Sequence, residues 1–281
     1  MSANVPEPHA LADGDAPAVT RRSARRWRWV VAVLVLLVGA VLVVQAWGAG
    51  DGGAPPGVSD SGAGLVSPAP SAPPTAPSFD AADLGALFVT ASDLEDAAPA
   101  AADGIEALTL GDDAAWGLKP GTSVSPPECL VAATVVAEPP VEYAMRAWGN
   151  AEVTFEQQVT LLASTDAAED AFRTLVTVVD ACPEYSLLGP EGESAQVSTS
   201  PAIEDQGYFP SLAQHAEVAR PDASTQAQVR GHLLVGNAIL TWTASTPADG
   251  DADQARERLG AEATLDAMVQ ARARAAAVAL P

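Results

Sequence analysis

The hydrophobic positions divide the chain into three zones. From Trp29 to Trp47 every residue except Gln45 is apolar. Residues 48–78 are dominated by Gly, Pro, Ala, Ser and Thr. Beyond residue 79 the apolar residues recur with the spacings of strands and helices, so the pattern predicts a folded domain over residues 79–281.

The first zone has the length of a membrane span. A helix over residues 29–47 would cover about 28 Å, close to the hydrocarbon thickness of a bilayer. The Arg-rich segment before it favours a cytoplasmic N-terminus, and Trp27, Trp29 and Trp47 lie where aromatic rings prefer the membrane interfaces. We therefore expect a basic cytoplasmic tail (1–28), a single-pass transmembrane helix (29–47) in the cell membrane, and an extracellular C-terminal domain.

A cleaved signal peptide is the alternative for the same zone. Val44-Gln45-Ala46 supplies the small residues that precede a cleavage site, so cleavage after Ala46 stays open. The long polar leader and the long apolar run favour an anchor, and both alternatives export the rest of the chain. Residues 48–78 hold too little apolar surface to fold and would average about 30 Å end to end as a coil, so we interpret them as a tether.

The clearest element in the third zone is a β-hairpin over residues 228–244. Gly236-Asn237 suits a two-residue turn, and this register pairs Gly231 with Trp242, leaving room for the indole. Apolar side chains then gather on one face, and a slip of one residue would destroy this sorting. The other face, expected to be polar, carries Arg230, His232, Thr241 and Thr243, with Leu234 and Ile239 near the turn.

The remaining pattern predicts a mixture of helices and strands. In chain order we expect a short helix (80–87), a proline-opened helix (126–134), strands (141–147 and 153–161), a helix (167–181), a polar loop (189–207) and a C-terminal helix (251–278). Asp166 and Glu169 have the spacing of a capping box for the helix at 167–181. One-sided alternation and hairpin chemistry favour the α+β class, an antiparallel β-sheet flanked by helices, here on one face.

Charge and cysteine usage narrow the function. The net charge is −22, and five of the 14 basic residues precede Trp29, so the exported part is strongly acidic. This charge excludes a function in nucleic-acid binding.

Cys129 and Cys182 are the only cysteines. In an oxidising compartment we expect them to form a disulfide that joins the helix ending at residue 181 to the helix at 126–134. A metal or nucleophile pair lacks a CxxC motif and a neighbouring His.

The sequence carries few signals of a reaction centre. His9 lies in the tail, His215 in a predicted strand and His232 in the hairpin, and no GxSxG motif marks a nucleophile. Asp249-Gly-Asp251-Ala-Asp253 lacks the central Gly and the final Glu of a calcium loop. We therefore predict no catalytic residue, no metal and no cofactor.

Several aromatic residues lie at predicted strand ends or in loops, with an arginine near two of them. Aromatic rings beside polar groups are typical of clefts for small molecules and glycans. The candidate ligand-binding residues are Trp116, Tyr143, Arg146, Trp148, Tyr185, Tyr208 and Phe209.

The order of these pieces resembles a known family. A basic start, one membrane helix and a Pro-rich tether precede Leu87-Phe-Val-Thr-Ala-Ser-Asp-Leu94, Pro127-Glu-Cys129, Ala181-Cys-Pro-Glu-Tyr185 and the closing hairpin. This resembles the extracellular sensor domain of mycobacterial PknH-type serine/threonine kinases and its kinase-free actinobacterial relatives, over roughly residues 84–275. The resemblance implies an antiparallel sheet flanked by helices, with a cleft for an unidentified ligand and no carried-over catalytic residue. Kinase-linked members typically have a second disulfide, for which this chain lacks the cysteines.

These observations lead to three hypotheses. The first is a membrane-anchored extracytoplasmic ligand-binding, sensor-like module of the cell envelope without its own kinase, since residues 1–28 are too few for one. The second is a structural or accessory envelope protein that binds another protein. The third is a hydrolase, which would need a nucleophile within hydrogen-bond reach of His215 or His232. A concave cleft would favour the first hypothesis and a flat apolar patch the second.

Overall fold

The computed structural model describes residues 76–280 except 111–114, 191, 223 and 248–256. The predicted cytoplasmic tail, the transmembrane helix at 29–47, most of the tether and the Asp249–Asp253 segment lie outside these residues. Within the described part, no helix is both long enough and apolar enough to cross a membrane. Residues 70–281 form one compact unit.

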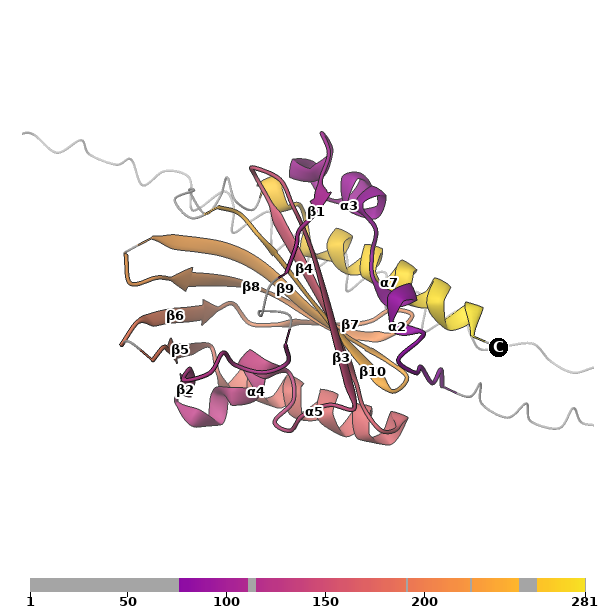
Figure 1. Ribbon diagram of the computed structural model, residues 1–281, viewed down its shortest axis with the longest axis horizontal. Helices are drawn as coiled ribbons and strands as arrows, with labels where there is room; N and C mark the ends of the chain where they lie inside the picture. The colour runs from indigo at the N-terminus through magenta and orange to yellow at the C-terminus, as the bar shows by residue number, and fades with distance from the viewer. Residues whose placement is uncertain (1–75, 111–114, 191, 223, 248–256, 281) are drawn as a thin grey trace, which may run out of the picture. The chain divides into compact units, whose positions relative to one another are not determined.

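The centre of this unit is an antiparallel sheet of ten strands (Figure 1). Nine strands follow the order β1-β3-β4-β10-β9-β8-β6-β5-β2, and β7 also pairs with β8. The strands are β1 (Glu106–Ala107), β2 (Ser123–Ser125), β3 (Glu142–Gly149), β4 (Thr154–Leu161), β5 (Glu184–Leu188), β6 (Ser194–Thr199), β7 (Ile203–Gln206), β8 (Pro210–Ala219), β9 (Thr225–Val235) and β10 (Ala238–Ser245). The α+β class with a helix-flanked antiparallel sheet is confirmed.

Helices cover both faces of the sheet, not one face as expected. The face that carries Trp242 packs against α2 (Leu84–Leu87), α3 (Ala91–Ala97), the 3-10 turn η1 (Pro99–Ala101) and α7 (Glu262–Ala279). The face that carries Ile239 packs against α4 (Leu130–Thr134) and α5 (Thr165–Ala181). We call these the α7 face and the α5 face. Figure 1 shows α7 and α3 on one side of the strands and α4 and α5 on the other.

The hairpin of β9 and β10 has the predicted register. Gly231 lies opposite Trp242, Leu233 opposite Leu240, and Val235 opposite Ala238. On the second face, the side chain of His232, expected on the polar side of the hairpin, is only 3% exposed, and Ile239 near the turn is fully buried. The α5 layer covers this end of the sheet, so the turn-proximal part of the hairpin is buried on both sides.

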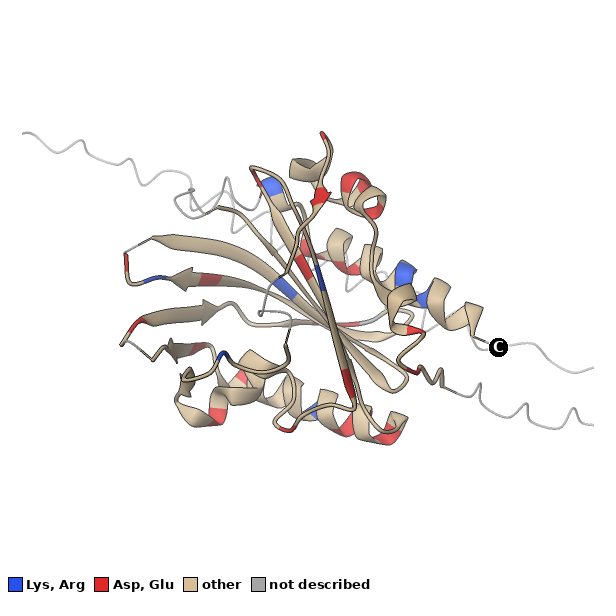
Figure 2. Cartoon of the chain, viewed as in Figure 1, with Lys and Arg blue, Asp and Glu red and all other residues tan. Residues whose placement is uncertain are grey.

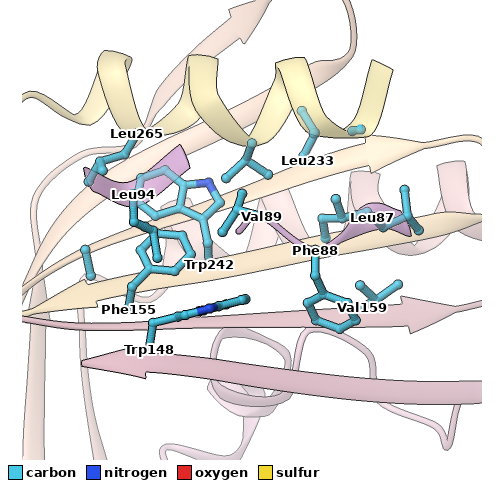
Figure 3. Packing of buried hydrophobic residues seen from close by; sticks show 14 of the residues in the cluster. Leu87, Phe88, Val89, Leu94, Trp148, Phe155, Val159, Leu233, Trp242 and Leu265 are labelled. Carbon is cyan, nitrogen blue, oxygen red and sulfur yellow. The ribbon is translucent and has the colours of Figure 1, made fainter. Parts of the chain in front are cut away.

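The largest apolar cluster lies between the sheet and α7 (Figure 3). Trp242 is completely buried there, and its ring is stacked at 6.2 Å from that of Phe155. A Cβ atom on Gly231 would come within 2.2 Å of the Trp242 ring, so the indole occupies the space that a side chain on β9 would need. The predicted size match between this glycine and this tryptophan is confirmed.

The predicted disulfide is present and joins the expected elements. Cys129 ends the 3-10 turn η3 (Pro127–Cys129), and Cys182 follows the last residue of α5. The helix cap differs from the expectation: the Ser164 hydroxyl accepts the backbone N–H of Ala167 at 3.2 Å, so the cap precedes Asp166 by two residues. A serine immediately before the first helical turn reaches the free N–H groups directly.

Two stretches of the chain depart from the predicted elements. Residues 189–207 contain β6 and β7 in place of a loop, because both pair with the long strand β8 along successive segments of it. The C-terminal helix is interrupted at Gly260, which has a φ of +80°, and α7 starts at Glu262. Few apolar residues mark β6 and β7, so their strand structure depends on tertiary pairing.

Candidate functional site

The seven candidate ligand-binding residues do not converge on one site. Arg146 and Trp148 point to the α7 face from β3, whereas Tyr143 and Tyr185 lie on the α5 face. Trp116 packs against the apolar cluster under α5. Tyr208 and Phe209 lie together in the turn before β8. The structure therefore separates the candidates into three groups, and their role in binding stays a prediction.

The β3 group contributes to the core. Trp148 is 6% exposed and packs at 6.2 Å from Phe155. The guanidinium of Arg146 lies 4.7 Å from the centroid of the Phe88 ring. These contacts give both side chains a structural function, since they cover the edge of the largest cluster.

A polar network crosses the α5 face. The Tyr185 hydroxyl accepts a hydrogen bond of 2.9 Å from Nη1 of Arg230, and Nε of Arg230 donates to Oε1 of Gln228, also at 2.9 Å. On the same face, burial first and the neighbouring Glu156 second raise the pKa of Tyr143 to about 12, so its hydroxyl stays protonated. Its hydroxyl donates to the Met145 sulfur at 3.7 Å.

The third group lines a cavity at the surface of the described domain. This cavity has a volume of about 660 Å³, within the range of small-molecule sites. We call it the Tyr208 groove. It lies where the chain enters the domain and α7 ends, and it is lined by Ala76, Pro77, Ser78, Phe79, Asp80, Asp83, Tyr208, Phe209, Ala277, Val278 and Leu280.

One wall of the groove is the segment that leads into the domain, residues 76–83. The side chain of Asn237, in the β9–β10 turn, forms hydrogen bonds with both backbone polar groups of Phe79 in this lead-in segment. Its Oδ1 accepts from the Phe79 N–H at 2.8 Å, and its Nδ2 donates to the Phe79 carbonyl at 3.0 Å. Gly236 beside it has a φ of +58°, and a Cβ there would lie 1.7 Å from the Pro77 carbonyl oxygen. The close approach of the lead-in segment therefore requires a residue without a Cβ atom at position 236, and the Asn237 amide holds the segment in place.

The opposite wall is fixed by a buried polar cluster. The Phe209 N–H donates to Oε1 of Gln270 at 3.1 Å, and the Gln270 amide donates to Oδ2 of Asp266 at 3.0 Å. The Ser211 hydroxyl donates to the same carboxylate oxygen at 2.9 Å. Burial raises the pKa of Asp266, although the hydrogen bonds from Gln270 and Ser211 oppose that shift. These bonds attach the Tyr208 turn to α7.

Tyr208 itself is left open to solvent. It is 57% exposed, its ring meets the Phe209 ring edge-on at 4.7 Å, and the Arg274 guanidinium lies 4.6 Å from its centroid. Val278, one turn after Arg274, is 72% exposed. The sequence identified the two aromatic residues but missed Asp80, Asp83 and Val278. Val278 could have been noticed as an apolar residue at the end of an Ala- and Arg-rich helix.

A second, smaller cavity contains His215. Its volume is about 230 Å³, and its lining includes Ser198, Ser200 and Glu217. Nε2 of His215 lies 2.6 Å from the Glu262 carboxylate, which connects β8 to the first turn of α7. The Ser200 hydroxyl accepts the backbone N–H of His215 at 3.0 Å and is not bonded to the imidazole. The contacts of this imidazole therefore support a structural link.

The hydrolase hypothesis depends on a hydroxyl beside a histidine. Nδ1 of His232 lies 2.9 Å from the Thr241 hydroxyl, but the two residues are 3% and 7% exposed. Burial first, and then the charge of Arg230, lower the pKa of His232 to about 3, so the imidazole is neutral. This pair has no open path to a substrate. Among the described residues, no cluster of three or more His, Cys, Asp or Glu could hold a metal.

Comparison with known proteins identifies the fold. No known family and none of the curated proteins matches this sequence. Among solved structures, the extracellular domain of PknH from Mycobacterium tuberculosis matches with a TM-score of 0.51 and 12% identity, over 71% of this chain and 97% of that domain. An uncharacterised Mycobacterium smegmatis protein, the Rv0999 orthologue, matches with a TM-score of 0.35 and 16% identity, over 60% of this chain and 86% of its own. This chain therefore has a fold similar to that of the PknH extracellular domain.

Proposed function

We propose that this protein is a membrane-anchored, extracytoplasmic ligand-binding module of the cell envelope, sensor-like and without a kinase of its own. The observation that carries the proposal is the Tyr208 groove. It has the volume of a small-molecule site and exposes an aromatic ring beside apolar walls. The likeness of the fold to an extracellular domain supports an outside location.

The form of the apolar surface favours a ligand over a protein partner. Large exposed apolar residues outside the groove are dispersed over separate strands and loops: Leu108, Val141, Leu188 and Ile203. Isolated residues of this kind are normal on monomeric proteins. The groove, by contrast, is concave. A structural or accessory role that needs a flat apolar patch is therefore the less supported alternative.

The test uses the domain over residues 70–281, which contains the described sheet, the disulfide and all three apolar clusters in one compact unit. After incubation with an envelope extract, native mass spectrometry should detect a bound small molecule. Tyr208→Ala should lose it, because the substitution removes one aromatic wall.

Ile203→Ala is the matched control for this experiment. Ile203 is 58% exposed, almost the same as Tyr208, but it lies on β7 and does not line the groove. The variant should retain the ligand. Retention by Tyr208→Ala, or equal loss from both variants, would contradict a binding site at the groove.

A further inference from the structure

We propose that the Tyr208 groove selects small amphiphilic cations, meaning molecules with an apolar body and one amine or ammonium group. This inference rests on the proposed function, since it names the ligand class for the same groove. Apolar and charged groups occupy different parts of the groove lining.

The apolar part of such a ligand would meet a continuous apolar surface. Phe79 and Phe209 are buried and form the floor, whereas Val278 is exposed and Leu280 half-buried near the end of α7. An alkyl or aryl body that covers these side chains removes apolar surface from water on both sides of the contact. Val278 would bury the most additional apolar surface, because its side chain is largely exposed without a ligand.

The charged part of the lining has one sign. Among the described lining residues, Asp80 and Asp83 are the charged ones, and Arg274 lies beside this lining, over the Tyr208 ring. Oδ1 of Asp80 accepts the Ala82 N–H at 2.7 Å, and Oδ2 of Asp83 accepts the Asp80 N–H at 3.0 Å. These bonds orient each carboxylate through one oxygen and leave the lead-in wall negatively charged. An anionic ligand would be repelled there, whereas a cation would be attracted.

The aromatic wall already contacts a cation from the protein. The Arg274 guanidinium lies over the Tyr208 ring at 4.6 Å, the arrangement of a cation–π interaction. Because this positive group opposes a second cation at the ring, a ligand's ammonium group would lie against the wall that carries Asp80 and Asp83. The net charge of −22 also attracts cations over a longer range at low salt. Figure 2 shows that acidic residues are spread over the helices and strands of the described domain.

The experiment compares three probes with the same eight-carbon chain: octyltrimethylammonium, octanoate and octyl glucoside, each below its micelle concentration. Binding to the domain over residues 70–281 is followed by NMR shifts of Tyr208 and Val278. Octyltrimethylammonium should bind about tenfold more tightly than the other two at low salt, since two partly exposed carboxylates contribute modestly each. The preference should shrink in 0.5 M NaCl.

The double variant Asp80→Asn and Asp83→Asn keeps the oxygen acceptors and removes the charges. It should abolish the preference for the cation while octyl glucoside still binds. Its matched control, Glu169→Gln with Asp180→Asn on α5, changes the net charge equally on the opposite face of the sheet and should keep the preference. Unfolding curves of both variants check that the fold is intact.

The outcomes separate the two proposals. Equal binding of all three probes at Tyr208 would overturn the cation inference and leave the groove as a binding site. Binding of none of them would overturn the cation inference and remove support for the groove itself. Loss of the preference in the α5 control variant would also overturn the inference, because it would show a general charge effect.

Discussion

Gly231 and Trp242 show how one residue type in one strand determines the position of a side chain in the next. The indole is fully buried above β9. Three of its ring atoms lie 2.2 to 2.4 Å from the position that a Cβ atom on residue 231 would occupy. A larger residue at position 231 would push the indole away from Phe155 and from α7. The largest apolar cluster therefore depends on the absence of a side chain.

We predict that Gly231→Ala destabilises the domain by about 3 kcal/mol, the upper part of the range for overpacking a core. Urea unfolding measures this free energy. The same substitution in a Trp242→Leu background should cost clearly less, because the clash partner is gone. Equal costs in the two backgrounds would show that the indole is not the obstacle.

His232 makes stability depend on pH. Its pKa is about 3 in the fold and about 6.5 in the unfolded chain. At a pH between these two pKa values, the imidazole binds a proton in the unfolded state but not in the folded state. The resulting stability is complete above pH 6.5 and is lost as the pH falls towards 3.

Between pH 7 and pH 5 this residue should reduce the free energy of unfolding by about 2 kcal/mol. In the variant His232→Asn, the amide can still meet the Thr241 hydroxyl but does not titrate. The loss between the two pH values should therefore be smaller in the variant by about that amount. Identical pH profiles for both proteins would contradict the burial of a neutral imidazole.

At the scale of elements, the lead-in segment is attached to the centre of the sheet. Asn237 makes bonds to Phe79 N, Phe79 O and the Leu162 carbonyl, at 2.8, 3.0 and 3.3 Å. Position 237 is thus the point where the tether would meet the folded domain, and the same contact forms one wall of the Tyr208 groove.

We predict that Asn237→Ala destabilises the domain by about 2 kcal/mol, because buried backbone groups lose their partners. Hydrogen exchange at the Phe79 amide should accelerate strongly. Asn150→Ala is a matched control, since Asn150 binds the Ala100 and Gly104 carbonyls at the opposite end of β3 and β4. It should leave Phe79 exchange unchanged. Unaltered exchange in Asn237→Ala would contradict the attachment.

The disulfide stabilises the helical layer on the α5 face of the sheet. It joins η3 to the end of α5 with a Cα–Cα distance of 5.7 Å, and 53 positions separate the two cysteines. Replacing both cysteines by alanine should cost roughly 4 kcal/mol in the free energy of unfolding, by the chain-entropy estimate. Dithiothreitol should lower the stability of the wild-type protein and leave the double variant unaffected. A wild-type protein insensitive to the reductant would argue against a structural role for this bond.

Local sequence rules predicted those elements whose signals are complete within a few residues. The β9–β10 hairpin has its turn, register and size match in one segment, and α5 has a clear apolar face. The strands β6 and β7 escaped prediction because their stability comes from β8. The Tyr208 groove could be predicted only in part, since residues 76–83 meet residues 208–209 and 277–280 through tertiary folding alone.

At the scale of the whole molecule, the Tyr208 groove lies beside the lead-in segment, in a domain that we propose is extracytoplasmic. The two faces of the sheet carry different features. The disulfide and the Arg230 hydrogen bonds lie on the α5 face, whereas the largest apolar cluster and the Tyr208 groove lie on the α7 face. The helix α7 contributes to both the apolar cluster and the groove. Asp266 and Gln270 form hydrogen bonds with residues at the Tyr208 turn, and Val278 lines the cavity.

The most direct test of the central claim is the location of the folded domain in living cells. Trypsin is added to intact cells, and the released peptides are identified by mass spectrometry, with opened cells for comparison. We predict cleavage after exposed arginines of the domain, such as Arg173, in intact cells, while the Arg-rich segment at residues 21–28 is cut only after opening. Protection of the whole domain until the cells are opened would contradict an extracytoplasmic ligand-binding module.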